Sequence, residues 1–320
     1  MKILFFLCFS LSLFAMESLV DIYQKQGIKD IEKLFDKTLS SQEYWEKKLQ
    51  NTDTRFGYFE GIDSILACNK QNKSLKLYTK DANNSFRLNV EFYAFVGEKE
   101  GDKQKEGDLK TPIGVYKILQ RLDKVDSFYG PLAYVTSYPN TYDKTQGKGG
   151  SGIWLHGLPL HQERDDYTKG CIAINNSNIE DIKEKIDFSK TLIYINQDDY
   201  IHVEKSSIVQ LLSQLFVWRS AWKYSDVDTY LSFYDTNFKR HDGMSITTFQ
   251  SYKRRVFSKN EIKSINFSKI NIIPYPVKDS NDIFLISFHE EYNSPSYHFS
   301  GDKELYIHFN TTSFTILAEK

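Results

Sequence analysis

The residues with the clearest chemical potential lie in one segment, residues 154–174, which reads WLHGLPLHQERDDYTKGCIAI. It places His156 upstream of Cys171, and Gly170 stands directly before the cysteine. A free thiol with a pKa of about 8.5 is only slightly ionised near neutral pH, so a neighbouring imidazole is needed to make it a strong nucleophile. Gly170 would let the backbone approach a substrate carbonyl. The segment therefore predicts acyl transfer by a thiol, with a histidine base and backbone oxyanion donors.

The N-terminus predicts export of the chain. Residues 1–15 combine Lys2, an apolar run over residues 3–14 and Ala15, which is the pattern of a secretory signal peptide cleaved after Ala15. The run is shorter than the about 20 residues that span a bilayer, so a retained anchor is the less favoured alternative. No later segment is apolar enough to predict a membrane span.

The cysteine content agrees with a reactive thiol in an exported chain. The chain has three cysteines, Cys8, Cys68 and Cys171. Cys8 lies in the predicted signal, and Cys68 ends an apolar run typical of a buried strand. A bridge between Cys68 and Cys171 is therefore the less favoured arrangement, and an unpaired thiol is a candidate nucleophile.

Two other assignments compete with this pair. His161 is a rival base, although its neighbours, residues 162–166, have the composition of a solvated loop. His156 and Cys171 could also be zinc ligands, but the sequence lacks the paired C-x-x-C or H-x-x-x-H spacing of such sites. Neither a metal nor an organic cofactor is predicted. The net charge of −1 argues against a nucleic-acid partner, which would call for a basic excess.

The elements that must position these residues divide the chain into an N-terminal segment and two domains. Residues 16–55 show helical spacing, which predicts three or four short helices that could contact a second copy of the chain. Residues 56–200 predict a mostly β domain, with one helix over 178–186 and a mobile glycine-rich loop over 147–152. Its strands are predicted at 64–68, 75–78, 86–97, 110–118, 153–155 and 191–195.

Residues 205–320 predict an α+β domain in which helices precede strands. Helices are expected over 206–222 and 247–257, with a helical pattern between them at Val227, Tyr230, Leu231, Tyr234 and Phe238. Strands are expected at 270–275, 283–292, 305–309 and 313–318. The aromatic residues of the first helices, Trp218, Trp222, Tyr230 and Tyr234, are assigned to the core rather than to a ligand. The basic run 253–255 is assigned to a solvated helix face.

Four sequence blocks, in this order, resemble the YkuD-type L,D-transpeptidase family. They are KEGDLKTPIG at 105–114, YPN at 138–140, HG at 156–157 and TKGCI at 168–172. The C-terminal region is similar to an NTF2-like domain. The combination resembles the exported L,D-carboxypeptidases that set helical cell shape in curved Gram-negative bacteria, which implies a periplasmic location.

The resemblance implies roles for individual residues. Cys171 would be the nucleophile and His156 the general base, with the backbone carbonyl of Gly157 orienting the imidazole and the N–H groups of Cys171 and Gly170 forming an oxyanion hole. Substrate contacts are expected from Trp154, Thr168, Lys169, Tyr138 and Ala173. The residues expected only to shape the site, or to form turns, are Gly107, Asp108, Thr111, Pro112, Gly114 and Asn140.

The sequence departs from the family pattern near the cysteine. Ala173 stands where an arginine is common, which removes a guanidinium that could hold a substrate carboxylate. Lys169 replaces a histidine or arginine and would help to lower the pKa of Cys171. The spacing between His156 and Cys171 is also short for the family, which predicts a trimmed loop.

These features predict an L,D-carboxypeptidase that trims the terminal D-alanine from peptidoglycan stem tetrapeptides through a cysteine acyl-enzyme and contributes to cell shape. One alternative is an L,D-transpeptidase that forms 3-3 cross-links or attaches proteins to peptidoglycan. Another is a non-catalytic scaffold that binds the wall. A sortase would need an arginine soon after the cysteine, and an NlpC/P60-type peptidase would place its cysteine before its histidine.

Overall fold

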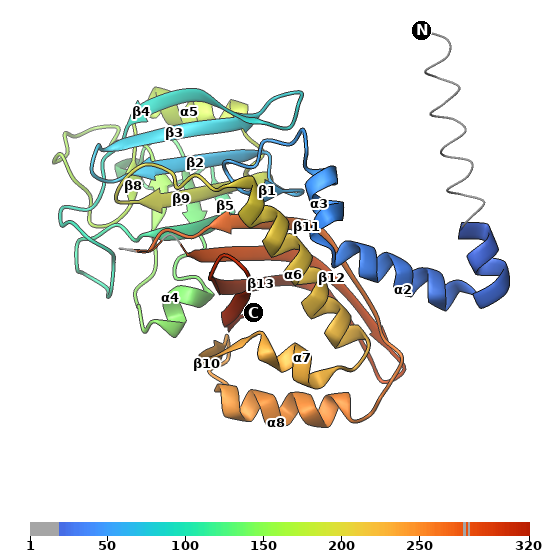
Figure 1. Ribbon diagram of the computed structural model, residues 1–320. Coiled ribbons are helices and arrows are strands. Elements are labelled where there is room, and N and C mark those ends of the chain that lie inside the picture. Colours follow the sequence, from blue (N-terminus) through green and yellow to red (C-terminus); the bar gives the residue numbers. More distant parts are fainter. Residues whose placement is uncertain (1–18, 278–279, 281) are drawn as a thin grey trace, which may run out of the picture.

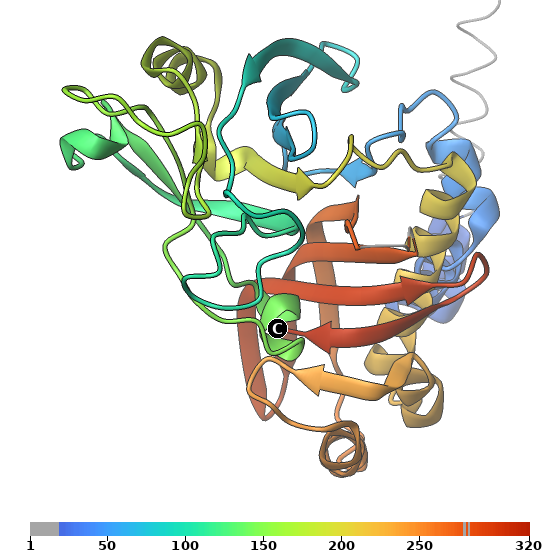
Figure 2. The same cartoon turned by 90° about the vertical axis from the view of Figure 1, so that its left-hand side faces the viewer.

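Two β-sheets, each with its own helices, meet along a shared apolar layer (Figures 1 and 2). The computed structural model describes residues 19–277, 280 and 282–320. The predicted signal peptide, residues 1–15, lies outside the described residues. The mixture of helices and strands confirms the predicted α+β class.

The first sheet has eight strands in the order β4-β3-β2-β9-β5-β6-β7-β8. Their bounds are β2 Ser64–Asn69, β3 Ser74–Lys80, β4 Phe86–Tyr93, β5 Gly114–Leu122, β6 Ala133–Thr136, β7 Trp154–His156, β8 Ile172–Ala173 and β9 Thr191–Asn196. Strand β2 is buried along its whole length because β3 and β9 flank it and apolar layers cover both of its faces. The central strands therefore form a rigid support for β7 and β8, which carry the candidate site.

Short helices and loops complete this first domain. Helix α5, Asn176–Lys185, follows β8 and buries Ile179 and Ile182 against the sheet. Helix α4, Thr141–Thr145, is capped by the side chain of Asn140. Two single 3-10 turns, Ser127–Tyr129 and Phe188–Lys190, connect strands.

The second sheet has six strands in the order β1-β11-β12-β13-β14-β10. Their bounds are β1 Tyr58–Phe59, β10 Tyr234–Arg240, β11 Ser264–Pro274, β12 Ile283–Ser294, β13 Tyr297–Phe309 and β14 Phe314–Glu319. Helices α6 Lys205–Lys223, α7 Val227–Ser232 and α8 Ile246–Phe257 lie against it (Figure 1). Their apolar side chains and those of the sheet form the largest core of the chain, which contains Trp218 and Tyr230. The assignment of these two aromatics to the core therefore agrees with the structure.

One predicted helical pattern is wrong. Tyr234 and Phe238 belong to strand β10, because helix α7 ends at Ser232. Residues four apart lie on one face of a helix, but they also lie on one face of a strand, where the side chains alternate. Both side chains are buried, and β10 pairs in parallel with β14.

The first two strands of the chain belong to different sheets. Strand β1 pairs with β11, with Tyr58 opposite Ile272, although residue 58 falls in the range predicted for the first domain. Side chains of both sheets form a common core between them, including Ile65, Tyr194 and Tyr275. Because this layer is apolar and continuous, the two domains are expected to move little relative to each other.

The N-terminal segment forms helices, as predicted. Helix α2, Ile28–Leu39, and helix α3, Gln42–Lys48, lie beside α6 (Figure 1). Trp45 of α3 is buried and its ring stacks on Phe216 of α6 at 5.6 Å. Across the ranges that the structure describes, no helix is both long and apolar enough to cross a membrane.

Candidate active site

Two adjacent parallel strands, β7 and β8, hold the segments that carry the imidazole and the thiol. In the pairing of β7 with β8, Leu155 lies opposite Ile172 and His156 opposite Ala173. Cys171 directly precedes β8, so the register of this pairing keeps its backbone close to the strand that ends at His156. Two residues far apart in the loop sequence, a histidine and a cysteine, are thereby brought to neighbouring backbone segments.

The orientation of His156 is set by its own backbone neighbour. Its Nδ1 lies 2.6 Å from the carbonyl oxygen of Gly157. A carbonyl only accepts, so Nδ1 carries the proton and Nε2 keeps its lone pair. The ring is 2% exposed and meets the ring of Tyr129 edge-on at 5.0 Å. Burial lowers the pKa of His156 to about 4, so the imidazole is neutral at physiological pH and its Nε2 is ready to accept a proton.

The thiol of Cys171 is protonated in the resting protein. Its Sγ donates to the carbonyl oxygen of Gly152 at 3.4 Å. Burial raises the pKa of Cys171, while the positive charges of Arg164 and Lys103 act against this rise. Lys169, predicted to lower this pKa, is exposed, and the cations that lower it are Arg164 and Lys103. Nucleophile and base therefore start as a neutral pair.

The turn before the cysteine is held by Thr168. Its buried hydroxyl donates to the carbonyl oxygen of Cys171 at 2.7 Å and accepts from the N–H of Gly170 at 3.0 Å. The structure thus gives Thr168 a role in supporting the turn, and its predicted contact with substrate stays a prediction. It also engages the N–H of Gly170, which was predicted as an oxyanion donor. The N–H of Cys171 has no acceptor in the described part of the chain and is the backbone donor left for an oxyanion.

Gly170 is required by its backbone and by its neighbours. Its φ is +136°, a conformation that side-chain-bearing residues rarely adopt. A Cβ at this position would lie 2.8 Å from the carbonyl oxygen of Lys110. The block KTPIG at 110–114 therefore packs directly against the turn that carries the thiol.

The loop formed by residues 98–112 is held in place by buried polar contacts. The hydroxyl of Thr111 accepts from the N–H of Gly97 at 2.8 Å, and the ammonium of Lys70 donates to the carbonyl oxygen of Thr111 at 2.6 Å. Asp108 accepts from Lys103 and from three backbone N–H groups of the loop, and these donors lower its pKa. These contacts agree with the site-shaping role predicted for Asp108 and Thr111. Lys70 was missed, since a lone lysine in a turn carries no sequence signal.

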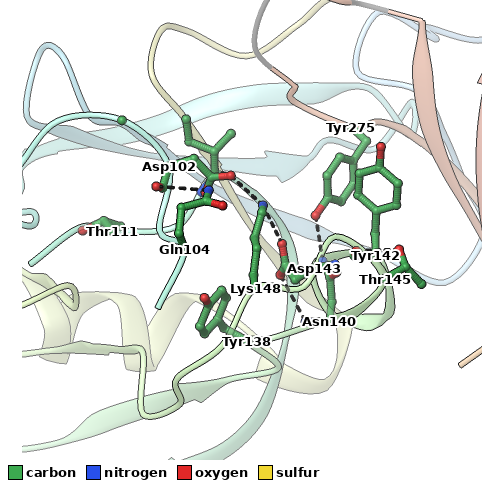
Figure 3. A network of polar contacts seen from close by, with 12 residues as sticks. Asp102, Gln104, Thr111, Tyr138, Asn140, Tyr142, Asp143, Thr145, Lys148 and Tyr275 are labelled. Atoms are coloured by element: carbon green, nitrogen blue, oxygen red, sulfur yellow. Dashed lines mark hydrogen bonds and ion pairs between the residues drawn. The ribbon is translucent and has the colours of Figure 1, made fainter. Parts of the chain in front are cut away.

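A second loop, whose Gly152 accepts from the thiol, is held by the network in Figure 3. Lys148 binds Asp102 at 2.6 Å and Asp143 at 2.9 Å, and Tyr138 donates to the carbonyl oxygen of Gly149 at 2.9 Å. The glycine-rich loop 147–152, predicted to be mobile, is therefore tied at two points. Tyr138 is buried and its hydroxyl serves this loop, while its predicted contact with substrate stays a prediction.

The same network reaches the second domain. Asn140 donates to the carbonyl oxygen of Val115 at 3.1 Å and to the hydroxyl of Tyr275 at 2.9 Å (Figure 3). Its side-chain oxygen also accepts from the N–H of Asp143, and this contact caps the N-terminus of helix α4. Asn140 is thus more than a turn residue, because it joins two domains behind the glycine-rich loop.

The remaining predicted positions differ in their access to substrate. Trp154 is partly exposed and its ring lies 5.0 Å from that of Tyr129. Ala173 is fully buried and exchanges both backbone hydrogen bonds with Phe95, and its predicted contact with substrate stays a prediction. His161 is exposed. Arg164, predicted to lie in a solvated loop, is half-buried.

The second domain contains a separate cavity of about 530 Å³. Lys253, predicted to lie on a solvated face of α8, instead points into this cavity, with its ammonium 4.8 Å from the ring centre of Trp222. Burial lowers the pKa of Lys253 to about 8 and raises the pKa of Glu290, which also lines the cavity, to about 7. Trp222 therefore belongs to the core and also lines this cavity. Among the described residues, no group of three or more His, Cys, Asp or Glu side chains could hold a metal ion.

Two family descriptions match the chain. The L,D-transpeptidase catalytic domain, called YkuD, matches residues 63–195, and the Cds6 C-terminal NTF2-like domain matches residues 210–320. YafK of Escherichia coli strain K12, which carries an L,D-transpeptidase name, is 30% identical over 113 residues. That match covers 35% of this chain and 43% of YafK, so the chain spans less than half the length of this relative.

Solved structures resemble the chain over most of its length. The helical cell shape determining protein Pgp2 of Campylobacter jejuni is 39% identical with a TM-score of 0.80, and the match covers 88% of this chain and 99% of Pgp2. Bd1075 of Bdellovibrio bacteriovorus is 28% identical with a TM-score of 0.65, over 83% of this chain and 96% of that protein. The resemblance predicted from the four sequence blocks and the C-terminal helices is confirmed.

Proposed function

This chain belongs to the YkuD L,D-transpeptidase family, and from this membership we propose that it is a peptidoglycan L,D-carboxypeptidase. Its substrate would be the stem tetrapeptide, from which it releases the terminal D-alanine and leaves a tripeptide. The observation that supports the proposal is the pairing of β7, which ends at His156, with β8, which Cys171 directly precedes, together with the contact of Nδ1 with Gly157 that leaves Nε2 unprotonated. The likeness to Pgp2, a cell shape determining protein, supports a role in cell shape.

In the first half of the reaction, Sγ of Cys171 attacks the carbonyl carbon between the L-centre of meso-diaminopimelate and D-alanine. Nε2 of His156 takes the thiol proton as the bond forms, and the carbonyl of Gly157 stabilises the resulting imidazolium through Nδ1. The N–H of Cys171 donates to the oxyanion. As the C–N bond breaks, the imidazolium gives its proton to the departing amine, and a thioester remains.

In the second half, a water molecule attacks the thioester while Nε2 of His156 accepts a proton from it. The tripeptide leaves with a new carboxyl group and the thiol is restored. An amine of another stem peptide could take the place of water, which would form a 3-3 cross-link. We favour water because Ala173 is buried and offers no side chain that could hold an acceptor strand.

The test is the product that the purified chain releases from disaccharide tetrapeptide. We expect D-alanine and tripeptide from the wild type, and none from Cys171→Ala. Cys68→Ala is the matched control, since Cys68 is a buried residue of β2 and should retain turnover if the variant folds. Products dominated by 3-3 dimers would show that the main reaction is transpeptidation and not hydrolysis. Wall binding without any turnover would favour a scaffold.

The location follows from the substrate. We propose that residues 1–15 direct the chain to the periplasm, where stem peptides are accessible. Fractionation of cells that produce the full chain, with mass spectrometry of its N-terminus, should find it in the periplasmic fraction beginning at Met16. An uncleaved chain in the membrane fraction would contradict this.

We also propose that helix α2 pairs with a second copy of the chain. Its contact with α6 is ionic, since Asp36 binds Arg219 and Lys223, while its apolar residues Ile28 and Phe35 are exposed. An exposed apolar face on a helix is typical of an interface. Sedimentation should show a dimer that Phe35→Glu converts to a monomer. A monomeric wild type at micromolar concentration would overturn this proposal.

A further inference from the structure

Arg164 occupies an unusual position in the loop between β7 and β8. Its guanidinium carbon lies 5.7 Å from the ring centre of Phe95 and 5.7 Å from that of Phe128. Contact with two aromatic faces holds a guanidinium plane in a defined place. The side chain is therefore ordered by packing, although the loop around it is exposed.

The two rings connect Arg164 to both halves of the candidate active site. Phe95 exchanges both backbone hydrogen bonds with Ala173, two residues after the thiol. Phe128 contacts the ring of Tyr129 at 5.4 Å, and Tyr129 in turn contacts the ring of His156 at 5.0 Å. The guanidinium thus lies between the strand that carries the cysteine and the residues that pack on the histidine. Its charge also acts on the pKa of both Cys171 and His156, which agrees with this position.

The guanidinium has hydrogen-bond donors to spare. Its Nη2 donates to the carbonyl oxygen of Tyr167 at 2.8 Å. Its Nε and Nη1 are buried, and neither has an acceptor among the residues that the structure describes. No carboxylate of those residues forms an ion pair with it, whereas Arg219, which is more deeply buried and also has an Nε without an acceptor among them, is paired with Asp36. Buried charged donors without acceptors are costly, so such a group is expected to receive a partner from outside the protein.

We propose that Arg164 binds a carboxylate of the stem peptide substrate. A guanidinium matches the geometry of a carboxylate better than any other side chain. Arg164 would then supply, from the loop, the cation that is missing at Ala173. This inference rests on the proposed function, because it takes the stem peptide as the ligand.

The stem tetrapeptide offers two carboxylates near the bond that is cleaved. One is the terminal carboxylate of D-alanine and the other is the free carboxylate of meso-diaminopimelate. Binding of the terminal carboxylate would restrict the enzyme to chain ends. Binding of the diaminopimelate carboxylate would instead select the third residue of the stem.

The experiment measures binding in the Cys171→Ala background, so that no turnover is needed. Calorimetry compares three proteins, namely Arg164→Gln, Arg164→Lys and the protein with intact Arg164. Each is titrated with the tetrapeptide and with two derivatives, in each of which one of the two carboxylates is an amide. Arg87→Gln is the matched control, because Arg87 is exposed and its ion pair among the described residues is with Asp81. Circular dichroism and thermal melting verify that each variant is folded.

We expect Arg164→Gln to weaken tetrapeptide binding roughly 10- to 100-fold, the usual range for a lost charged hydrogen bond. Arg164→Lys should recover part of this loss. One of the two amide derivatives should bind the protein with intact Arg164 as weakly as the unmodified tetrapeptide binds the Arg164→Gln variant. The Arg164→Gln variant should bind that amide and the unmodified tetrapeptide with equal affinity. The amide that behaves in this way identifies the carboxylate.

Three results would overturn the inference. The first is a folded Arg164→Gln variant that binds the tetrapeptide with unchanged affinity. The second is an Arg164→Gln variant that still prefers the tetrapeptide over both amide derivatives. The third is that the protein with intact Arg164 does not bind the tetrapeptide. The proposed function is judged separately by D-alanine release from the wild type. If the protein binds the carboxylate through Arg164 but releases no D-alanine, Arg164 is a ligand-binding residue and the proposed hydrolase activity is wrong.

Discussion

The side-chain amide of Asn140, in the first domain, donates a hydrogen bond to the hydroxyl of Tyr275, in the second domain, at 2.9 Å. Both residues are buried. Asn140 also begins the helix that leads into the glycine-rich loop, and Gly152 of that loop accepts from the thiol of Cys171. The second domain is therefore linked by a short series of contacts to the backbone beside the nucleophile.

Tyr275→Phe removes this hydroxyl and should destabilise the protein by about 1 kcal/mol, the usual net value of one hydrogen bond. Asn140 keeps its contacts with Val115 and Asp143, so the loop should stay folded. Urea unfolding measures the loss, and Tyr297→Phe, at an exposed tyrosine, is the control. Equal stability of the two variants would show that the contact between the domains contributes nothing.

Gly170→Ala should abolish turnover, with a loss of at least about 100-fold. The added Cβ would lie 2.8 Å from the carbonyl oxygen of Lys110, and the backbone at φ +136° would be strained, so the turn that positions Cys171 must shift. Gly149→Ala is the matched control, because a Cβ there meets nothing within 4 Å. D-alanine release by the two variants provides the comparison, and normal release by Gly170→Ala would refute this account of the turn.

The acid limb of the activity profile should lie near pH 4. Burial lowers the pKa of His156 to about 4, so the imidazole remains a base well below the ordinary histidine value of about 6.5. The logarithm of kcat/KM should be flat between about pH 5 and 7 and fall below that range. A limb near pH 6.5 would show that His156 is not the base or is more solvated than its 2% exposure indicates.

The same pKa predicts a loss of stability in acid. The unfolded chain binds a proton at this histidine below about pH 6.5, whereas the folded chain resists it down to about pH 4. The free energy of unfolding should therefore fall by about 3 kcal/mol as the pH decreases across this interval. His156→Gln lacks this titration, so its stability should fall less over the same interval. Parallel stability curves for the two proteins would contradict the prediction.

Asp36→Ala should destabilise the docking of helix α2 on helix α6 by about 3 kcal/mol, because it leaves buried charges without a partner. Asp36 accepts from Lys223 at 2.6 Å and from Tyr224 at 2.7 Å, and it also binds Arg219. Hydrogen exchange should show α2 opening in this variant. Asp30→Ala, which removes only an exposed pair with Lys33, is the control and should change exchange little.

Much of the fold could be predicted because its elements have strong periodic patterns. Helices α6 and α8 begin and end within one residue of the predicted ranges, and the predicted strands all occur. The prediction failed at Tyr234 and Phe238, where a spacing of four fits a strand and a helix equally. The pairing of β1 with β11 could not be predicted, since a strand of two residues has no pattern of its own.

The site was predicted in its chemistry and only partly in its geometry. The positions of His156, Gly157 and Cys171 agree with the roles that were expected for them, which remain to be tested. Thr168, Tyr138 and Ala173 were expected to contact substrate, yet each is buried and engaged by the backbone. Polar residues next to a nucleophile can bind a ligand or hold the loop, and the residue type does not distinguish these cases.

The sequence by itself determined the family, the class of the fold and the thiol and imidazole, because these depend on residue types in a fixed order. Only the tertiary structure decided which cations act on Cys171, namely Arg164 and Lys103. Lys169 is close in sequence but points to solvent, whereas Arg164 is held between Phe95 and Phe128 from different loops. The reason is that a charge acts through distance and burial in space, and both are set by contacts between segments far apart in the chain.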